Sequence, residues 1–316
     1  MDGSLAGAPG RHRRTALVTG GGRGLGFEVA RALAEQGAHV VLACRSTERG
    51  RAAAARIGGR TDVVHLDLAS LDSVRRAAAE VVDRYERLDL LVNNAGVMFP
   101  SRRRTEDGFE PHFGVNHLGH FALTGLLLCL MRQVPGSRVV TVASLAHRVG
   151  AGPLDETRAR AADGHRSLAA YGRSKRANLL FARELQHRLA GSGAETVSVA
   201  AHPGLSATEL WQGQTPAWLR PVSRGALHLL AQPPVRAALP VLRAATDTLL
   251  PGGSYLGPGE RFESRGAPAP AASSRASRDA LAQVRLWELS TALTGVTYGP
   301  SPSRSRADGP PAPAGR

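Results

Sequence analysis

Aromatic residues, cysteines and lysines are all scarce in this 316-residue sequence. Aromatic side chains make up 4% of the chain and hydrophobic residues 42%, so a sizeable core must consist mainly of alanine, leucine and valine. Two cysteines, Cys44 and Cys129, cannot form a disulfide framework, and no metal-ligand spacing accompanies them. We therefore expect no metal site and a reducing, cytoplasmic environment.

Long apolar segments are also missing. No apolar stretch precedes residue 15, which predicts that there is no signal peptide. The longest apolar run, "FALTGLLLCLM" at 121–131, is shorter than the roughly 20 residues that cross a bilayer. This run therefore predicts a buried helix, and we expect no membrane span.

Acidic residues are outnumbered, since 26 of them stand against 40 lysines and arginines and leave a net charge of +14. This excess raises the alternative of a nucleic-acid-associated protein. No basic run, including "RRR" at 102–104, is interleaved with the aromatic residues on which bases stack. We expect no nucleic-acid partner; a strong shift of DNA on a gel at physiological salt would favour the alternative.

Short β-branched runs alternate along the chain with longer alanine-rich amphipathic segments. This alternation predicts an α/β fold, with a doubly wound parallel sheet of the Rossmann type covered by helices on both faces. We expect helix 46–59 to be capped by Ser46 or Thr47 and to end before Gly58. Strands are expected at 15–19, 39–44, 62–68, 88–96, 137–144 and 195–204, and helices at 27–37, 46–59, 70–88, 110–134, 168–191 and 279–294.

The pattern loosens after about residue 204. We expect a substrate lid at about 205–250 and a last short strand in "GGSYLG" at 252–257. Proline, serine and arginine dominate residues 299–316, which predicts a disordered tail, and residues 1–13 are expected to form another. One domain is thus expected over residues 14–298.

A glycine-rich stretch, "TGGGRGLG" at 19–26, follows the first expected strand and opens the first helix. Glycines there let the backbone turn sharply and approach a pyrophosphate, which the free N–H groups of the helix N-terminus would bind. A plain glycine-rich turn is the alternative. The strand–loop–helix context favours a dinucleotide site.

The second strand distinguishes between the two nicotinamide cofactors. A carboxylate at its end would bind the ribose 2′-hydroxyl of NAD, but this strand ends in Cys44 and Arg45. Arg45, with Arg23 from the glycine loop, can pair with the 2′-phosphate of NADP. The alternative is two solvated arginines, and we expect NADP(H) rather than NAD(H).

Lys175 is the single lysine among the 40 basic residues, and it stands in "YGRSK" at 171–175. Tyr171 and Lys175 are four residues apart and so share one helix face. An unperturbed tyrosine, with a pKa of about 10, is a poor acid–base catalyst near neutrality. A neighbouring ammonium favours the phenolate, so we expect Lys175 to lower the pKa of Tyr171.

These residues form part of a larger set that resembles the short-chain dehydrogenase/reductases. The matching pieces run in the family's order over roughly residues 13–296. They are "TGGGRGLG", "DL" at 67–68, "NNAG" at 93–96, "VN" at 115–116, "VVTVAS" ending at Ser144, "YGRSK", and "HPGLSATEL" at 202–210.

The resemblance implies a role for each matching residue. Tyr171 would be the general acid–base, Ser144 would hold the substrate oxygen, and Asn116 would anchor a proton-relay water beside Lys175. Lys175 would also bind the nicotinamide ribose. The residues implied in cofactor binding are Gly20, Arg23, Gly24, Leu25, Gly26, Arg45, Asp67, Leu68, Asn93, Ala95, Tyr171, Lys175, Pro203, Gly204 and Thr208.

Two details are similar to the retinol dehydrogenase and protochlorophyllide-reductase-like branch. One is the spacing from Ser144 to Tyr171, which is 171 − 144 = 27, with an insert that begins "LAHRVG". The other is the presence of the segments "ACRS", "FGVNHLGHFALT" and "LWELSTALTG". The family often forms homodimers through the helices around 110–134 and 168–190, although relatives in this branch include monomers.

Several further residues allow two interpretations. His112, His117 and His120 cluster in sequence, but a helix would spread them, and no acidic set accompanies them. His147 and His202 are expected to be packing or loop residues near the site. Trp211 and Trp218 would either contact an apolar substrate or pack within the lid.

The sequence thus predicts an NADP(H)-dependent oxidoreductase. Hydride would pass between the nicotinamide and a carbonyl or alcohol carbon of a small, apolar substrate. The alternative is a catalytically silent NADP(H)-binding sensor or scaffold. Binding of NADPH without turnover would favour that alternative.

Overall fold

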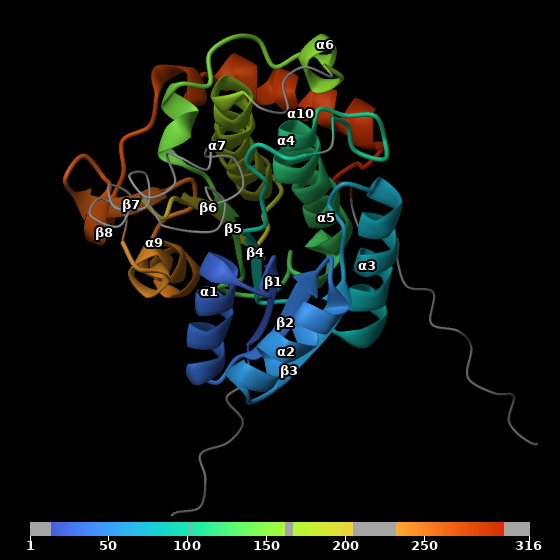
Figure 1. Cartoon of the computed structure of the whole chain (residues 1–316), viewed down its shortest axis with the longest axis vertical. Coiled ribbons are helices and arrows are strands. Elements are labelled where there is room, and N and C mark those ends of the chain that lie inside the picture. The colour runs from blue at the N-terminus through green and yellow to red at the C-terminus, as the bar shows by residue number, and fades with distance from the viewer. Residues whose placement is uncertain (1–13, 102, 162–166, 205–231, 300–316) are drawn as a thin grey trace, which may run out of the picture.

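The computed structural model describes residues 14–101, 103–161, 167–204 and 232–299. An eight-stranded sheet with the order β3-β2-β1-β4-β5-β6-β7-β8 forms its centre, as Figure 1 shows. Strands β1 to β7 run parallel, and only β8 pairs antiparallel, with β7. The strands are β1 (Thr15–Thr19), β2 (His39–Cys44), β3 (Thr61–His65), β4 (Leu90–Asn93), β5 (Arg138–Val142), β6 (Val197–Ala201), β7 (Tyr255–Glu260) and β8 (Arg265–Pro270). The predicted doubly wound sheet is confirmed.

Helices cover both faces of this sheet (Figure 1). One face packs against α3, α5, α7 and α10, and the other against α1, α2 and α9. The helices are α1 (Gly24–Glu35), α2 (Thr47–Ile57), α3 (Leu71–Arg84), α4 (Pro111–Phe113), α5 (Gly119–Leu127), α6 (Glu156–Ala159), α7 (Leu168–Gly191), α9 (Pro234–Thr246) and α10 (Ala280–Thr294).

Serine and aspartate side chains start several of these helices. Ser46, Ser70, Ser167 and Asp279 each accept a hydrogen bond from the backbone N–H three residues on, which satisfies a donor that has no partner inside the helix. The predicted cap at Ser46 is confirmed. Gly58 ends α2 with a φ of +71°, a conformation that glycine adopts without strain.

The long helix expected at 110–134 is interrupted. After α4 the chain makes a π turn over Gly114–Leu118, continues as α5, and ends in a 3-10 turn at Leu128–Leu130. The whole stretch Pro111–Leu130, which contains most of the apolar run 121–131, spans 20 residues with a mean hydropathy of 1.4, so it is long and apolar enough to cross a membrane and the shortness of the run does not exclude a span. Of its apolar 18-residue window, 78% is buried inside the protein, as in the core helix of a soluble protein.

The chain beyond β6 departs furthest from expectation. The strand expected at 252–257 is β7, and it forms a hairpin with β8, whose sequence "RGAPAP" carries no strand signal. Prolines are tolerated in β8 because it is an edge strand. Residues 234–246, placed in the lid by the sequence, form α9 and pack into the core against α1. Residues 205–231, most of the expected lid, lie outside the described residues, as do both expected tails apart from Gly299.

Four of the aromatic residues form one cluster. Phe121, Phe181, Trp287 and Tyr298 pack together with ring centroids 4.4 to 6.5 Å apart. Trp287 comes from α10, so this cluster fastens the closing helix onto α5 and α7. Part of the face through which homodimers were expected is thus covered by the chain itself.

Candidate active site

The sequence motifs meet at one edge of the sheet. In a parallel sheet the carboxyl ends of the strands lie side by side, and loops that leave them build the binding site. The glycine loop follows β1, Arg45 follows β2, Asp67 follows β3, Ala95 follows β4 and Ser144 follows β5. The residues expected to act together are therefore brought to the same edge.

The glycine loop requires its glycines. Gly20 and Gly24 have φ values of +68° and +56°, in the left-handed region that favours glycine. A Cβ on Gly26 would lie 2.5 Å from both the Asn94 Nδ2 atom and the Gly20 carbonyl oxygen. Helix α1 begins at Gly24, inside this loop. The backbone N–H groups of its first turn, Leu25 included, have no partner within the helix and therefore lie free at the loop. The arrangement fits a pyrophosphate.

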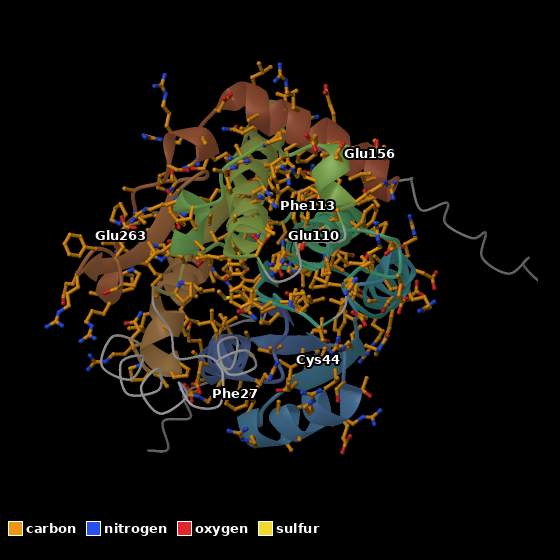
Figure 2. The ribbon with its side chains drawn as sticks, turned by 45° about the horizontal axis from the view of Figure 1, so that its top comes forward. Phe27, Cys44, Glu110, Phe113, Glu156 and Glu263 are labelled. Atoms are coloured by element: carbon orange, nitrogen blue, oxygen red, sulfur yellow. The ribbon has the colours of Figure 1, made fainter. Side chains whose placement is uncertain are left out.

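The two arginines proposed to read the cofactor are both exposed. Arg23 is the residue before α1, and Arg45 directly follows β2. Cys44, the residue before Arg45, is a buried free cysteine that accepts hydrogen bonds from the Gly21 and Gly22 backbones. Burial raises the pKa of the Cys44 thiol. Figure 2 shows Cys44 and Phe27 in this half of the molecule, away from Glu110 and Phe113.

Other residues of the cofactor set have structural tasks as well. Asp67 Oδ1 accepts a hydrogen bond from the Ala69 N–H, and Leu68 packs in the core. The buried Asn93 side chain points toward α5, where its Nδ2 donates to Thr124 Oγ1 at 2.9 Å, while its Oδ1 has no hydrogen-bond partner among the described residues.

The end of β6 contributes Pro203 and Gly204. Gly204 has a φ of +71°, and its N–H donates to His202 Nδ1 at 3.2 Å. A Cβ there would lie 2.4 Å from the Ser264 carbonyl oxygen. Thr208, the remaining residue of the set, lies outside the described residues.

Thr19, Asn94 and His120 hold this edge together, and none of them was assigned a role in the site from the sequence. Thr19 Oγ1 accepts hydrogen bonds from the Asn94 and Ala95 N–H groups, both at 2.9 Å, and lies 2.9 Å from His120 Nε2. His120 Nδ1 faces the Asn116 carbonyl oxygen at 3.0 Å, so Nδ1 donates and Nε2 accepts from the Thr19 hydroxyl. Two features of the sequence could have pointed to these contacts: Asn94, the second Asn of "NNAG", and His120, which stands four residues after Asn116.

Tyr171 and Lys175 lie on α7 beside the end of β5. The Ser144 side chain lies beside the Tyr171 phenol and acts to lower its pKa. Lys175 Nζ lies 5.8 Å from the centre of the Tyr171 ring and donates to the Val142 carbonyl oxygen at 3.0 Å. Three of the four proposed catalytic residues thus come together.

Burial dominates the titration of this pair. It raises the pKa of Tyr171 to about 12, against the lowering effect of the Ser144 hydrogen bond, and it lowers the pKa of Lys175 to about 8. The expectation that Lys175 lowers the pKa of Tyr171 is therefore wrong for this arrangement. Lys175 points its amine to the β5 backbone, and desolvation of the phenol is the largest cause of the Tyr171 shift.

Asn116, the fourth residue, lies on the π turn with its amide fully engaged. Its Oδ1 accepts from the Val97 N–H at 2.7 Å, and its Nδ2 donates to the Val97 carbonyl oxygen and to Ser174 Oγ, both at 3.0 Å. A Cβ on Gly96 would lie 3.3 Å from Asn116 Oδ1 and 3.6 Å from Lys175 Nζ. Asn116 is therefore beside Lys175, as expected.

The five histidines singled out in the sequence have separate partners. His112 contacts Glu110, His117 contacts Ser290, and His120 contacts Thr19. His147 Nδ1 donates to the Ser144 carbonyl oxygen at 2.7 Å, and His202 accepts from Gly204. Within the described residues, no group of three His, Cys, Asp or Glu side chains could hold a metal ion.

Known proteins share this sequence and fold. Residues 14–155 match the short chain dehydrogenase family. The chain is 46% identical over 202 residues to Retinol dehydrogenase 13 of Homo sapiens, covering 62% of this chain and 60% of that protein, less than two thirds of its length. It is 39% identical over 304 residues to Polyprenol dehydrogenase of Danio rerio, covering 91% of this chain and 89% of that protein.

A solved structure agrees with these relatives. The crystal structure of an uncharacterized protein from Mycobacterium Paratuberculosis superposes with a TM-score of 0.73 at 40% identity, covering 90% of this chain and 95% of that one. The site geometry, the family match and these relatives lead to one assignment. The chain belongs to the short-chain dehydrogenase/reductase family, in its retinol dehydrogenase-like branch, and is an oxidoreductase that acts on CH–OH or C=O groups with a nicotinamide cofactor.

Proposed function

We propose that this protein is an NADP(H)-dependent oxidoreductase for small, apolar carbonyl or alcohol substrates. The observation that carries the proposal is the place of Ser144 beside the Tyr171 phenol, with Lys175 buried one helical turn away. All three groups lie at the sheet edge where the glycine loop begins. A serine and a tyrosine so placed can bind one substrate oxygen between them.

The chemistry is divided between cofactor and protein. A bound nicotinamide supplies or accepts the hydride. Tyr171 exchanges the proton with the substrate oxygen, and Ser144 polarises that oxygen. Lys175 would hold the nicotinamide ribose, and its hydrogen bond to the Val142 carbonyl oxygen keeps α7 against β5. Its raised pKa keeps the Tyr171 phenol protonated near neutrality, the state in which it can donate a proton to a carbonyl oxygen.

Preference for NADP(H) is supported by the end of β2. Arg45 is exposed there, and the residues that follow β2 directly are Arg45, Ser46 and Thr47, with no carboxylate to bind a ribose 2′-hydroxyl. Arg23 lies in the neighbouring glycine loop. Two guanidinium groups can bind a 2′-phosphate through charge-assisted hydrogen bonds.

An apolar substrate is supported from two sides. The names of two relatives, Retinol dehydrogenase 13 and Polyprenol dehydrogenase, refer to apolar alcohols. The loop after β4 places half-buried Val97 and Phe99 close to the catalytic edge. Their side chains offer carbon surface rather than charge to a substrate.

The cellular setting is part of the same proposal. Two free cysteines favour the cytoplasm, and burial of the Pro111–Leu130 stretch favours a core helix over a membrane span. A homodimer that forms through α5 and α7 would have to use the part of these helices that α10 does not cover. Sedimentation at two protein concentrations measures whether the protein is a monomer or a homodimer. No nucleic-acid partner is expected.

A substrate panel tests the proposal. Ketones, aldehydes and secondary alcohols of increasing apolar length are offered with NADPH or NADP, and in parallel with NADH or NAD. We expect turnover of at least one carbonyl class with NADPH. Tight NADPH binding without turnover of any compound would favour the silent sensor or scaffold instead.

A further inference from the structure

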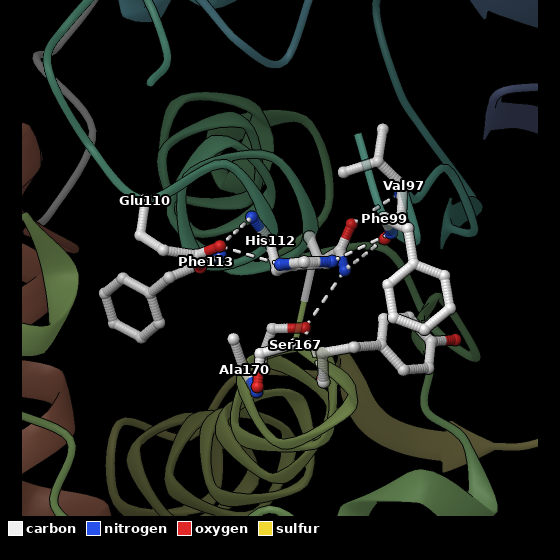
Figure 3. Close-up of polar contacts among 10 residues, drawn as sticks. Val97, Phe99, Glu110, His112, Phe113, Ser167 and Ala170 are labelled. Carbon is white, nitrogen blue, oxygen red and sulfur yellow. Dashed lines mark hydrogen bonds and ion pairs between the residues drawn. The ribbon is translucent and has the colours of Figure 1, made fainter. Parts of the chain in front are cut away.

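We propose that His112 is a positioning residue for this reaction. It fixes the loop 97–99 and the Tyr171 ring relative to each other. The inference rests on the proposed function. His112 lies on α4 and is fully buried, and Figure 3 shows it between Glu110 on one side and Phe99 on the other. Its contacts reach both the catalytic tyrosine and the loop that follows β4.

The contacts of His112 fix the role of each ring nitrogen. Nε2 lies 3.0 Å from the Phe99 N–H, which can only donate, so Nε2 is the acceptor. Nδ1 lies 2.7 Å from Glu110 Oε1, and it carries the ring proton toward that carboxylate. Glu110 in turn accepts from the His112 and Phe113 N–H groups at the start of α4. The ring therefore cannot turn over without losing both bonds.

The loop that His112 holds adopts a conformation that needs support. Phe99 has a φ of +50°, in the left-handed region that non-glycine residues rarely adopt. His112 binds its N–H, and Asn116, one helical turn further on, binds Val97 at both its N–H and its carbonyl oxygen. Figure 3 shows His112 beside Val97 and Phe99. Two side chains of one helical segment thus clamp both ends of the loop.

The same imidazole touches the catalytic tyrosine. The His112 ring meets the Tyr171 ring edge-on, with centroids 6.0 Å apart and planes at 67°. It meets the Phe99 ring in the same manner, at 6.5 Å and 89°. His112 therefore sets the distance between the loop and the tyrosine. It thereby also sets the width of the site between Phe99 and Tyr171.

The insert of this branch reaches His112 through Glu110. The Glu110 N–H donates to the Ala159 carbonyl oxygen of α6 at 2.7 Å, and the Arg160 guanidinium lies over the Phe109 ring at 5.2 Å. Ala159 and Arg160 belong to the segment between Ser144 and Tyr171. Contacts therefore run continuously from the insert through Glu110 and His112 to the loop at the site.

Loss of this spacing should affect the chemical step more than cofactor binding. His112 makes no contact with the glycine loop or with Arg45 among the described residues, whereas it contacts Tyr171 directly. A small misplacement of a catalytic group can lower a rate by up to about 100-fold. We expect kcat to fall and the Kd for NADPH to stay unchanged.

Three variants separate hydrogen bonding from packing. His112→Phe keeps an aromatic ring but cannot bind Phe99 or Glu110. His112→Gln keeps one donor and one acceptor. His112→Asn keeps a donor to Glu110 but is too short to reach Phe99. His187→Gln, at an exposed position of α7, is the matched control.

The test compares kcat, KM, NADPH affinity and hydrogen exchange of the Phe99 amide. We expect about 10- to 100-fold lower kcat and faster exchange in His112→Phe and His112→Asn, with rescue in His112→Gln. Wild-type kcat and exchange in folded His112→Asn would overturn the inference and leave the proposed function intact. A wild-type protein that binds NADPH but reduces no substrate would overturn the proposed function, and this inference with it.

Discussion

Lys175 Nζ donates a hydrogen bond to the Val142 carbonyl oxygen at 3.0 Å, two residues before Ser144. Asn178 Nδ2 donates to the same oxygen at 3.1 Å, so α7 is fixed to the end of β5 by two side chains. Because Ser144 lies beside the Tyr171 phenol, this contact helps to set where the phenol lies relative to Ser144. The single lysine of the chain thus has a geometric task besides its charge.

Lys175→Arg should therefore be costly although it keeps the charge. The site is buried and offers one carbonyl oxygen, whereas a guanidinium is larger, planar and carries five N–H donors. We expect kcat to fall by about 100-fold because the phenol is displaced. Steady-state kinetics measure the loss, and Arg285→Lys, at an exposed position of α10, serves as control. Wild-type kcat in Lys175→Arg would show that position 175 needs only a positive charge.

Arg45→Asp tests the choice of cofactor. Loss of a charge-assisted hydrogen bond costs about 1.5–3 kcal/mol, so NADPH should bind about 10- to 100-fold more weakly. NADH, which has no 2′-phosphate, should change little or bind better. Fluorescence titration of both cofactors measures the difference, with Arg285→Asp as the control for net charge. Equal losses for NADPH and NADH would contradict the assigned role of Arg45.

Gly26→Ala tests the glycine loop. The added Cβ would lie 2.5 Å from two atoms of its surroundings, so the loop must shift, at a cost of about 1–3 kcal/mol in unfolding free energy. We also expect NADPH affinity to drop by at least about 10-fold, because the N–H groups of the α1 first turn move. Gly191→Ala is the matched control, since no atom lies within 4 Å of a Cβ there. Unchanged NADPH affinity in the Gly26→Ala variant would exclude the close approach.

The buried residues His117 and His120 should make the unfolding free energy depend on pH. Burial lowers the pKa of His117 to about 3 and that of His120 to about 4, from the ordinary 6.5. The unfolded chain therefore binds more protons below about pH 6.5, and stability falls as the pH drops toward 4 and then 3. Between pH 7 and pH 5 each histidine should contribute a loss of about 2 kcal/mol.

Urea unfolding at these two pH values measures that loss. His117→Gln should reduce the difference between pH 7 and pH 5 by about 2 kcal/mol, whereas His187→Gln, which is exposed, should leave it unchanged. A variant at position 117 with the wild-type pH dependence would show that this histidine is protonated in the folded protein.

The order of strands and helices could be predicted because local signals agree with the fold. Ser46 and Gly58, for example, mark the ends of α2 as a cap and a left-handed terminus require. Strand β8 could not be predicted, since its prolines and glycine gain strand geometry only from pairing with β7. The π turn at Asn116 likewise has no local sequence signal.

In the candidate site, too, some features could be predicted from local sequence and others could not. Residues in family motifs, such as Ser144, Tyr171 and Lys175, were predictable by their spacing. The contacts around them were not, because His112 meets Tyr171, and His120 meets Asn116 and Thr19, only after distant segments fold together. Burial, which raises the pKa of Tyr171 rather than lowering it, also belongs to the folded chain and not to the "YGRSK" motif.

Single-turnover reduction of a carbonyl by NADPH in the wild-type protein and in Tyr171→Phe tests the central claim most directly. The variant removes one oxygen, the proton donor, and leaves the ring against His112. The account predicts that NADPH oxidation slows by at least about 100-fold while the Kd for NADPH stays within about twofold. Wild-type rates in Tyr171→Phe would contradict it.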